Sequence, residues 1–486
     1  MSNFEVLLDT QWDVVIVGSG IGGSVTACSL AEQGYKVLIL EKGSMTHPLG
    51  SLPIWKEAIQ DHKTGYTGIP FLGECVGGSS RLFGMVMESL EPSDFINQGG
   101  GWPSSFQEWS TWAHLAERLF SVKEAPAVLE FNGLYKQMKS QGLETKPLRL
   151  AFQPDSNCQY CQSDLCKTSC KVDAWTGPLT RALRSGNAHL VTEIEVKSLI
   201  HRGGRVIRIE CQKYPGGPTI SISGKQFVLA AGALKTPLIL KRSSSVNQQF
   251  AFEKLKATGS YFMRHLIDLY ILCWPDWKSL SLTQKKMLSQ IKAWGSDSLY
   301  QKNHFKLGTL QSFGSLPNFE YIWPDVKRNQ PWIRYTPFLK PLARQVVEYI
   351  FQHPTAASIV EDSPNVMNRI EEGAHGELNL FYKMSEEDQI KIDYMRRLVS
   401  KALGPMLLRQ EFSAENNFRL AHACGTCRMG TDLNTSVTNY FGQVHQSENL
   451  WIADSSVFPS STGKNPSLII ASHALRLVQK MKDLGI

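Results

Sequence analysis

The sequence lacks any apolar run near the roughly 18 residues that a membrane-spanning helix needs, and it lacks internal repeats and low-complexity tracts. Its composition is also unexceptional, since 42% of the 486 residues are hydrophobic and 20% are charged. This composition excludes a disordered, a collagenous and a disulfide-scaffold protein. The length predicts about three domain-sized units or one large two-lobed enzyme.

An excess of one charge is also missing, because 51 Lys and Arg residues stand against 44 Asp and Glu residues. The formal charge of +7 is a mild bias and does not predict a nucleic-acid partner. Residues 1–5 lack the basic segment followed by an apolar one that marks a signal peptide, so we expect a cytoplasmic protein. In a reducing cytoplasm, clusters among the ten cysteines indicate metal or redox sites before disulfides.

A βαβ unit opens the chain. Residues 13–17 predict a buried parallel strand, and residues 24–33 predict a helix that stops at Gly34. Residues 35–40 predict a second strand, which ends at Glu41.

The turn between the first strand and the helix carries the pattern G-x-G-x-x-G. In this pattern Gly18 permits the tight turn, Gly20 lets the backbone approach a pyrophosphate, and Gly23 allows close helix–strand packing. The helix N-terminus attracts phosphates, and Glu41 is placed to accept hydrogen bonds from ribose hydroxyls. The unit therefore predicts dinucleotide binding and leaves FAD and NAD open.

Five further motifs follow in order along the chain. They are GECVGGSS at 73–80, FVLAAGALKTP at 227–237, HACGTCRMG at 422–430, NLWIADSSVFP at 449–459 and Asn465-Pro466. Together they resemble the glucose–methanol–choline (GMC) family of FAD oxidoreductases. Weaker matches lie at 101–103, 263–265, 364–365 and 368–369. The resemblance spans nearly the whole chain, and the poor match is about 270–360, where the family builds its substrate cap.

The resemblance implies an α/β fold, with a Rossmann-type FAD-binding lobe and a smaller α+β substrate lobe that contains an antiparallel sheet. We expect a discontinuous FAD-binding domain over residues 1–90, 175–245 and 422–486. The substrate domain would comprise residues 91–174 and 246–421. Helical patterning at Ser385 to Leu403 predicts a helix behind the antiparallel sheet.

The resemblance also implies oxidation of an alcohol (CH–OH) to a carbonyl, with the hydride passing to flavin N5. His422 matches the family's catalytic base, and histidine titrates near working pH. Asn465 matches a second active-site position and would orient the substrate oxygen. Asn465 and Pro466 also suit the N-cap and first position of a helix over residues 466–482, whose N-terminus would favour anionic reduced flavin.

Other motif residues match positions that hold the cofactor in the family. Asp454 would lie near the ribityl chain and pyrophosphate, and the backbone of Val196 would meet the adenine. Phe83 is a departure, because many relatives carry an Asn shortly after the serines. No family-type attachment residue is evident, so we expect non-covalent FAD. The loop expected against the flavin and pyrophosphate contains Gly77, Gly78, Ser79 and Ser80.

Four of the ten cysteines fall within 13 residues, at Cys158, Cys161, Cys166 and Cys170. Thiolates at such spacing can converge on one metal centre, and some bacterial GMC dehydrogenases hold an iron–sulfur cluster in a comparable segment. An iron–sulfur cluster, a zinc site, two disulfides and unliganded thiols all stay open. Cys424 and Cys427 are expected to be packed cysteines.

The cysteine cluster favours a dehydrogenase that passes electrons to a non-oxygen acceptor, which could be a protein. The alternatives are an oxygen-using alcohol oxidase in a biosynthetic pathway, a non-oxidative lyase or decarboxylase on the same fold, and a non-catalytic flavin- or metal-holding protein. The aromatic-rich stretch 272–354 indicates either a bulky or apolar substrate, a docking surface or ordinary core.

Overall fold

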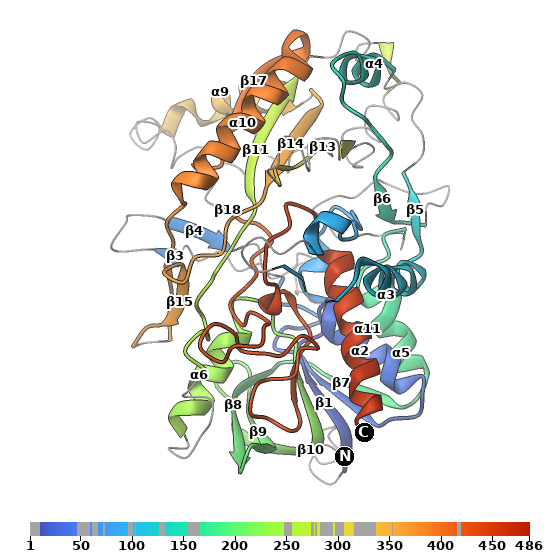
Figure 1. Cartoon of the computed structure of the whole chain (residues 1–486), viewed down its shortest axis with the longest axis vertical. Helices are drawn as coiled ribbons and strands as arrows, with labels where there is room; N and C mark the ends of the chain where they lie inside the picture. The colour runs from blue at the N-terminus through green and yellow to red at the C-terminus, as the bar shows by residue number, and fades with distance from the viewer. Residues whose placement is uncertain are drawn as a thin grey trace.

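The computed structural model shows two sheets, one toward each end of an elongated molecule (Figure 1). The structure describes residues 10–45, 59–60, 67–70, 73–95, 101–102, 104–125, 132–153, 166, 168, 170–246, 255–273, 277, 279–281, 295–296, 306–314, 337–351, 353–374, 376–415 and 419–486.

The first sheet has seven strands in the order β7-β2-β1-β10-β9-β8, and β19 pairs with β10 beside this path. Its central strands are parallel and apolar, as fully buried strands require. Strands β8 and β9 extend it as antiparallel partners. The strands are β1 (Trp12–Val17), β2 (Val37–Leu40), β7 (Ala188–Val191), β8 (Ile194–Arg202), β9 (Arg205–Lys213), β10 (Thr219–Leu229) and β19 (Leu450–Ile452).

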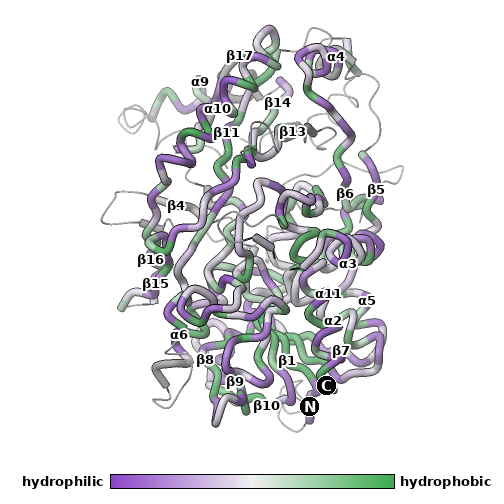
Figure 2. The backbone as a smooth tube through the Cα atoms, viewed as in Figure 1, coloured by the Kyte–Doolittle hydropathy of each residue, from purple (hydrophilic) through white to green (hydrophobic). Residues whose placement is uncertain are grey.

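Helices from both ends of the chain pack together beside this sheet. The C-terminal helix α11 (Ser467–Asp483) contacts α2 (Ile21–Ala31) and α3 (Phe106–Leu119), and α2 also contacts α5 (Thr180–Arg184). The central strands of this sheet and α2 are among the most hydrophobic parts of the backbone (Figure 2). The predicted start of the first helix at Ser24 is wrong by one turn, because Gly22 and Gly23 lie buried inside the helix.

The second sheet is antiparallel, with the order β12-β13-β14-β11-β17. The long helix α10 (Glu386–Leu403) covers it, as expected, and the Ser385 hydroxyl caps the helix by accepting from the backbone N–H of Asp388 at 3.0 Å. The strands are β11 (Leu266–Leu272), β12 (Gly295–Ser296), β13 (Gly308–Gly314), β14 (Thr355–Val360) and β17 (Leu407–Phe412).

Smaller elements surround these two sheets. They are β3 (Ile59–Gln60), β4 (Thr67–Pro70), β5 (Val122–Glu124), α4 (Asn132–Ser140), β6 (Arg149–Ala151), α6 (Thr236–Val246), α9 (Lys340–Phe351), β15 (Arg369–Glu372), β16 (Leu378–Phe381) and β18 (Arg419–Leu420). A parallel Rossmann-like sheet with a separate antiparallel sheet confirms the predicted fold class. The exact boundaries of the two lobes stay a prediction. No helix within the described ranges is long and apolar enough to cross a membrane.

Candidate active site

The glycine-rich turn after β1 has the shape that the sequence predicts for a phosphate-binding turn. Gly18 has a φ of +98°, and an added Cβ there would lie 2.4 Å from the carbonyl oxygen of Ala230. Gly20 differs, because no heavy atom lies within 4 Å of the place where its Cβ would stand. Gly20 is the N-cap of α2 and makes no side-chain cap, so open space lies at the N-terminal end of this helix.

The second glycine segment meets this turn. The backbone N–H of Gly77 donates to the Ser19 hydroxyl at 3.0 Å, and a Cβ on Gly78 would lie 3.2 Å from the Cα of Gly20. Ser79 accepts from the backbone N–H of Gly73 at 3.0 Å, and Ser80 donates to the carbonyl of Gly77 at 2.7 Å. Both serines therefore hold the loop, and the glycines of two separate motifs lie together.

Glu41 lies at the end of β2 and faces the same turn. Its carboxylate accepts from the backbone N–H and the hydroxyl of Ser19, at 2.9 and 2.7 Å, and from the N–H of Gly43 at 2.8 Å. Burial raises the pKa of Glu41, while these hydrogen bonds act in the opposite direction. The backbone N–H of Ile194, at the start of β8, donates to the Glu41 carbonyl at 3.0 Å, and Val196 is two residues further on.

Asp454 follows β19 and contacts the motif at residues 227–237. One carboxylate oxygen accepts from the Thr236 hydroxyl at 2.6 Å and from the N–H of Gly232 at 2.8 Å. The other accepts from the N–H of Ser456 at 2.9 Å. Burial raises the pKa of Asp454, and these bonds oppose the shift. The carboxylate therefore fixes two loops.

These residues fit FAD. The open cradle beside Gly20, which Gly78 adjoins, suits a pyrophosphate, because it lies at a helix N-terminus and a side chain at Gly20 would fill it. Glu41 and the first residues of β8 lie next to this cradle, on the side expected for ribose and adenine.

His422 has an unusual backbone, with a φ of +61°. This left-handed conformation is uncommon for a residue other than glycine and is often found at functional sites. Two backbone hydrogen bonds of 3.0 Å between Met263 and Cys424 hold its segment against the residues that precede β11. Its ring packs edge-on against His265, with the two Nδ1 atoms 2.7 Å apart.

Asn465 is buried, and its Oδ1 atom has no hydrogen-bond partner in the part of the chain that the structure describes. Its backbone N–H donates to Glu88 at 3.3 Å. The predicted N-cap role of Asn465 is wrong. Pro466 has helical backbone angles and occupies the cap position of α11, so the helix begins at Ser467. The Asn465 amide is therefore not used as a cap.

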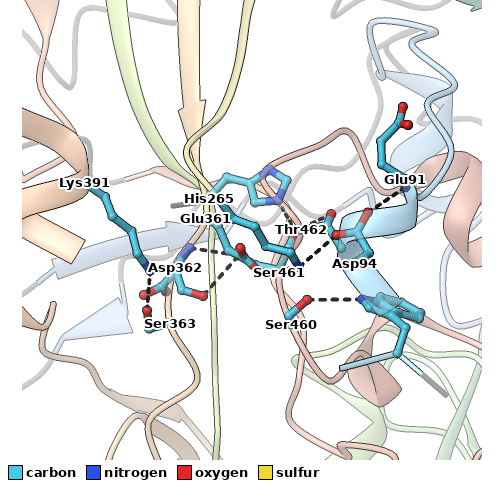
Figure 3. A network of polar contacts seen from close by, with 12 residues as sticks. Glu91, Asp94, His265, Glu361, Asp362, Ser363, Lys391, Ser460, Ser461 and Thr462 are labelled. Atoms are coloured by element: carbon cyan, nitrogen blue, oxygen red, sulfur yellow. Dashed lines mark hydrogen bonds and ion pairs between the residues drawn. The ribbon is translucent and has the colours of Figure 1, made fainter. Parts of the chain in front are cut away.

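A network of polar contacts joins the loop before Asn465 to the antiparallel sheet (Figure 3). Ser460 accepts from the indole N–H of Trp102 at 3.1 Å, and Ser461 contacts Asp362 and His265. His422 thus lies two hydrogen bonds from the loop that carries Asn465. The sequence assigned no role to His265 or Glu88; the weak family match at 263–265 includes His265, and no motif includes Glu88.

Two of the four cysteines in the predicted metal set, Cys158 and Cys161, lie outside the described residues. Cys166 and Cys170 both contact the Thr168 hydroxyl, at 3.9 and 3.0 Å. Among the described residues no group of three or more His, Cys, Asp or Glu side chains could hold a metal, and the proposed metal set stays a prediction.

The two cysteines beside the predicted catalytic motif are packed, as expected. Cys424 and Cys427 are buried, and burial raises the pKa of both thiols. Most aromatic residues of the stretch 272–354 lie outside the described residues. Side-chain exposure is known for two of them: Trp277 is 8% exposed and Phe338 is 75% exposed, so these two do not form one surface.

Known proteins align with this chain over nearly its whole length, including both sheets. The chain is 25% identical to paromamine 6'-oxidase of Streptomyces fradiae, over 96% of this chain and 91% of that protein. It is 22% identical to a long-chain-alcohol oxidase of Arabidopsis thaliana, over 97% and 67% of the two chains.

Solved structures show the same fold. Pyridoxine 4-oxidase from Mesorbium loti aligns with a TM-score of 0.65 at 18% identity, over 97% of this chain and 99% of that one. Formate oxidase aligns with a TM-score of 0.69 at 15% identity, over 98% and 99%.

The family itself is shown by two matches. Residues 13–266 match the N-terminal part and residues 340–474 the C-terminal part of the GMC oxidoreductases. The chain belongs to the GMC oxidoreductase family and is an FAD-dependent oxidoreductase that acts on CH–OH donors.

Proposed function

We propose that this enzyme is an alcohol oxidase, which converts a CH–OH group of a small molecule to a carbonyl and uses oxygen as electron acceptor. The relatives and solved structures named above are all oxidases. The dehydrogenase hypothesis depended on the cysteine cluster alone, whereas the names of these relatives support an oxidase.

The cofactor has a defined place in this proposal. FAD, when bound, supplies the hydride acceptor. The chain would hold it with the N-terminus of α2, the glycine pair Gly20 and Gly78, and Glu41. The hydrogen bonds of Asp454 keep the adjoining loops in position.

His422 is the proposed base, and one observation carries this assignment. A histidine in a strained backbone conformation is hydrogen-bonded to a buried second histidine, which contacts the loop leading to Asn465. His422 would take the hydroxyl proton of the substrate. Asn465, whose buried Oδ1 atom has no partner among the described residues, would donate from its Nδ2 amide to the substrate oxygen and orient it, which leaves the hydroxyl hydrogen to His422.

The test uses the FAD-loaded enzyme and a panel of alcohols without oxygen. The panel contains an aminoglycoside alcohol, a long-chain alcohol and pyridoxine, chosen after the named relatives. We expect at least one alcohol to bleach the flavin absorbance, and air to restore it with release of hydrogen peroxide. If air restored the flavin absorbance only very slowly, but an added electron-accepting dye restored it quickly, the enzyme would instead be a dehydrogenase.

A variant assigns the base. H422A should bind FAD and slow flavin reduction by about 10²- to 10⁴-fold, because general-base catalysis contributes that much. The control is H114A, whose side chain is 72% exposed on α3. Equal reduction rates in H422A and H114A would exclude His422 as the base.

A further inference from the structure

His265 is a buried histidine to which neither the motifs nor the proposed reaction assigns a task. It is 2% exposed and immediately precedes β11. Its ring lies between two groups. Nε2 is 2.6 Å from the carbonyl oxygen of Ser461, and Nδ1 is 2.7 Å from Nδ1 of His422. The two ring centroids are 4.7 Å apart, with the planes at 74°.

The chemistry of these partners determines which ring nitrogen of each histidine carries hydrogen. A carbonyl oxygen only accepts, so Nε2 of His265 must carry a hydrogen and donate it to Ser461. In a neutral imidazole the other nitrogen then holds a lone pair, so Nδ1 of His265 is an acceptor. The short contact to His422 requires a donor, and therefore Nδ1 of His422 carries its hydrogen. The lone pair of His422 is then on Nε2.

The Ser461 carbonyl is the last acceptor in this series of hydrogen bonds, and its position is fixed by further contacts. The Ser461 hydroxyl accepts from the backbone N–H of Asp362 at 2.9 Å and donates to the Asp362 carbonyl at 3.2 Å. The Asp362 carboxylate accepts in turn from the backbone N–H of Arg264 at 2.9 Å, the residue before His265. Figure 3 shows His265, Ser461 and Asp362 in this arrangement.

The backbone aligns the two histidines as well. The N–H of His265 donates to the carbonyl of Ala421, the residue before His422, at 3.1 Å. Together with the paired hydrogen bonds of Met263 and Cys424, this contact keeps the two segments in register. The ring-to-ring contact is therefore imposed by backbone pairing and does not depend on exposed side chains.

We propose that His265 is a positioning residue, which holds His422 in the tautomer whose Nε2 lone pair can take a proton from the substrate hydroxyl. This inference rests on the proposed alcohol oxidation. Once His422 has taken up the proton at Nε2, its Nδ1–H bond to His265 becomes charge-assisted and stronger. The Ser461 carbonyl at the far end only accepts hydrogen bonds, so the proton cannot pass beyond the two histidines. His265 thereby favours the charged product of proton transfer over the neutral starting form.

Two variants separate this role from simple packing. H265F keeps a ring but has no acceptor, whereas H265N places an amide oxygen on Cγ, where the histidine has Nδ1. We expect H265F to slow flavin reduction about 10²-fold, near the lower limit for losing a general base, with KM nearly unchanged. H265N should recover most of that loss. The matched control is H201F, which replaces another buried histidine, in β8, and should keep the wild-type rate.

A second measurement does not depend on activity or on FAD. With ¹⁵N-labelled histidine, NMR identifies the protonated ring nitrogen of His422, and the H422A and H265F spectra assign the two signals. We expect hydrogen on Nδ1 in the wild type and in H265N, and on Nε2 in H265F. Hydrogen on Nε2 in the wild type would overturn the proposal, as would equal reduction rates in H265F and H265N. If no alcohol reduces the wild type, the proposed function fails while the tautomer is still decided by NMR.

Discussion

The backbone of His422 combines a functional side chain with an unfavourable conformation. Its φ of +61° lies in the left-handed region, where a Cβ is crowded and glycine has no penalty. The surrounding hydrogen bonds between residues 263–265 and 421–424 hold it there. Such strain persists only where the neighbouring structure over-determines it.

The strain makes glycine the more stable replacement. H422G should be more stable than H422A by about 0.5 to 1 kcal/mol, since the alanine Cβ keeps the crowding that glycine removes. Urea unfolding of the FAD-free variants measures the difference. In β8 the order should reverse, with H201G less stable than H201A, because glycine weakens a strand. If H422A were as stable as H422G or more stable, the backbone at this position would have to relax when the histidine is replaced.

Two glycines of one turn should respond differently to an added side chain. G20V should cost only about 1 kcal/mol of stability, because valine is a poor N-cap residue for α2 while nothing lies within 4 Å of its Cβ position. Its FAD affinity should fall about tenfold or more, since the side chain fills the cradle; a tenfold loss equals about 1.4 kcal/mol. G18A should be unstable before any cofactor is added, because its Cβ would meet the Ala230 carbonyl. Urea midpoints measure the stability of both variants, and flavin fluorescence titrations measure their FAD affinity. Wild-type FAD affinity in G20V would show that the cradle is not part of the FAD site.

At the scale of the element, α10 is fastened to the antiparallel sheet by one arginine. Arg396 makes two hydrogen bonds to Asp268 of β11, at 2.7 and 2.9 Å, and two to Glu415, at 2.8 and 2.6 Å. The Asp268 side chain is only 3% exposed. The hydrogen bond from Arg396 lowers the pKa of Glu415 to about 2.

Loss of this arginine should destabilise the enzyme in a pH-dependent way. R396M should lower the free energy of unfolding by about 3 kcal/mol, because it leaves a buried carboxylate without its partner. Glu415 ionises near pH 4.3 when unfolded and near 2 when folded. Its contribution is therefore complete above about pH 4.3 and is lost as the pH falls toward 2. Urea midpoints at pH 6 and pH 3 should differ less in R396M than in wild type. R397M, at an exposed neighbouring position, is the control.

Elements with strong local patterns could be predicted from the sequence, and features that depend on contacts between distant residues could not. The apolar run of β1, the G-x-G-x-x-G turn and the Ser385 cap are local signals, and the structure has each of them. The start of α2 was misplaced because Gly22 packs against Ala453, a residue more than 400 positions away. The pairing of His265 with His422 spans 157 residues and leaves no local pattern. Tertiary packing decided these features, and a single sequence does not display it.

At the scale of the whole molecule, buried ion pairs connect the two ends. Lys306, just before β13, lies 3.0 Å from Asp94 and 3.9 Å from Glu361, which follows β14. The Asp94 side chain is fully buried. Burial raises the pKa of Glu361, and the charge of Lys306 opposes that shift. One cation therefore compensates two carboxylates between the antiparallel sheet and the loops below it.

Removing that cation should destabilise the fold, more so at high pH. K306M should cost about 3 kcal/mol or more. Without Lys306 the pKa of Glu361 rises further above its unfolded value of about 4.3. The folded state then binds the proton more tightly than the unfolded state, so stability falls as the pH rises through that range. Thermal unfolding at pH 5 and pH 8 should show a larger deficit at pH 8, and the exposed K139M on α4 should show none. Equal deficits at both pH values would mean that Glu361 does not titrate.

The position of β19 bears on how the chain is made. Residues 227–229 of β10 pair on one side with β1, which the ribosome has already released, and on the other with residues 450–452 of β19. At about 5–20 residues per second, synthesis of the intervening stretch takes on the order of ten seconds or more. For that interval the nascent sheet has an apolar edge with open backbone groups, which invites pairing with other chains. Coexpressed chaperones should therefore raise the soluble yield, and a chain cut before β19 should aggregate.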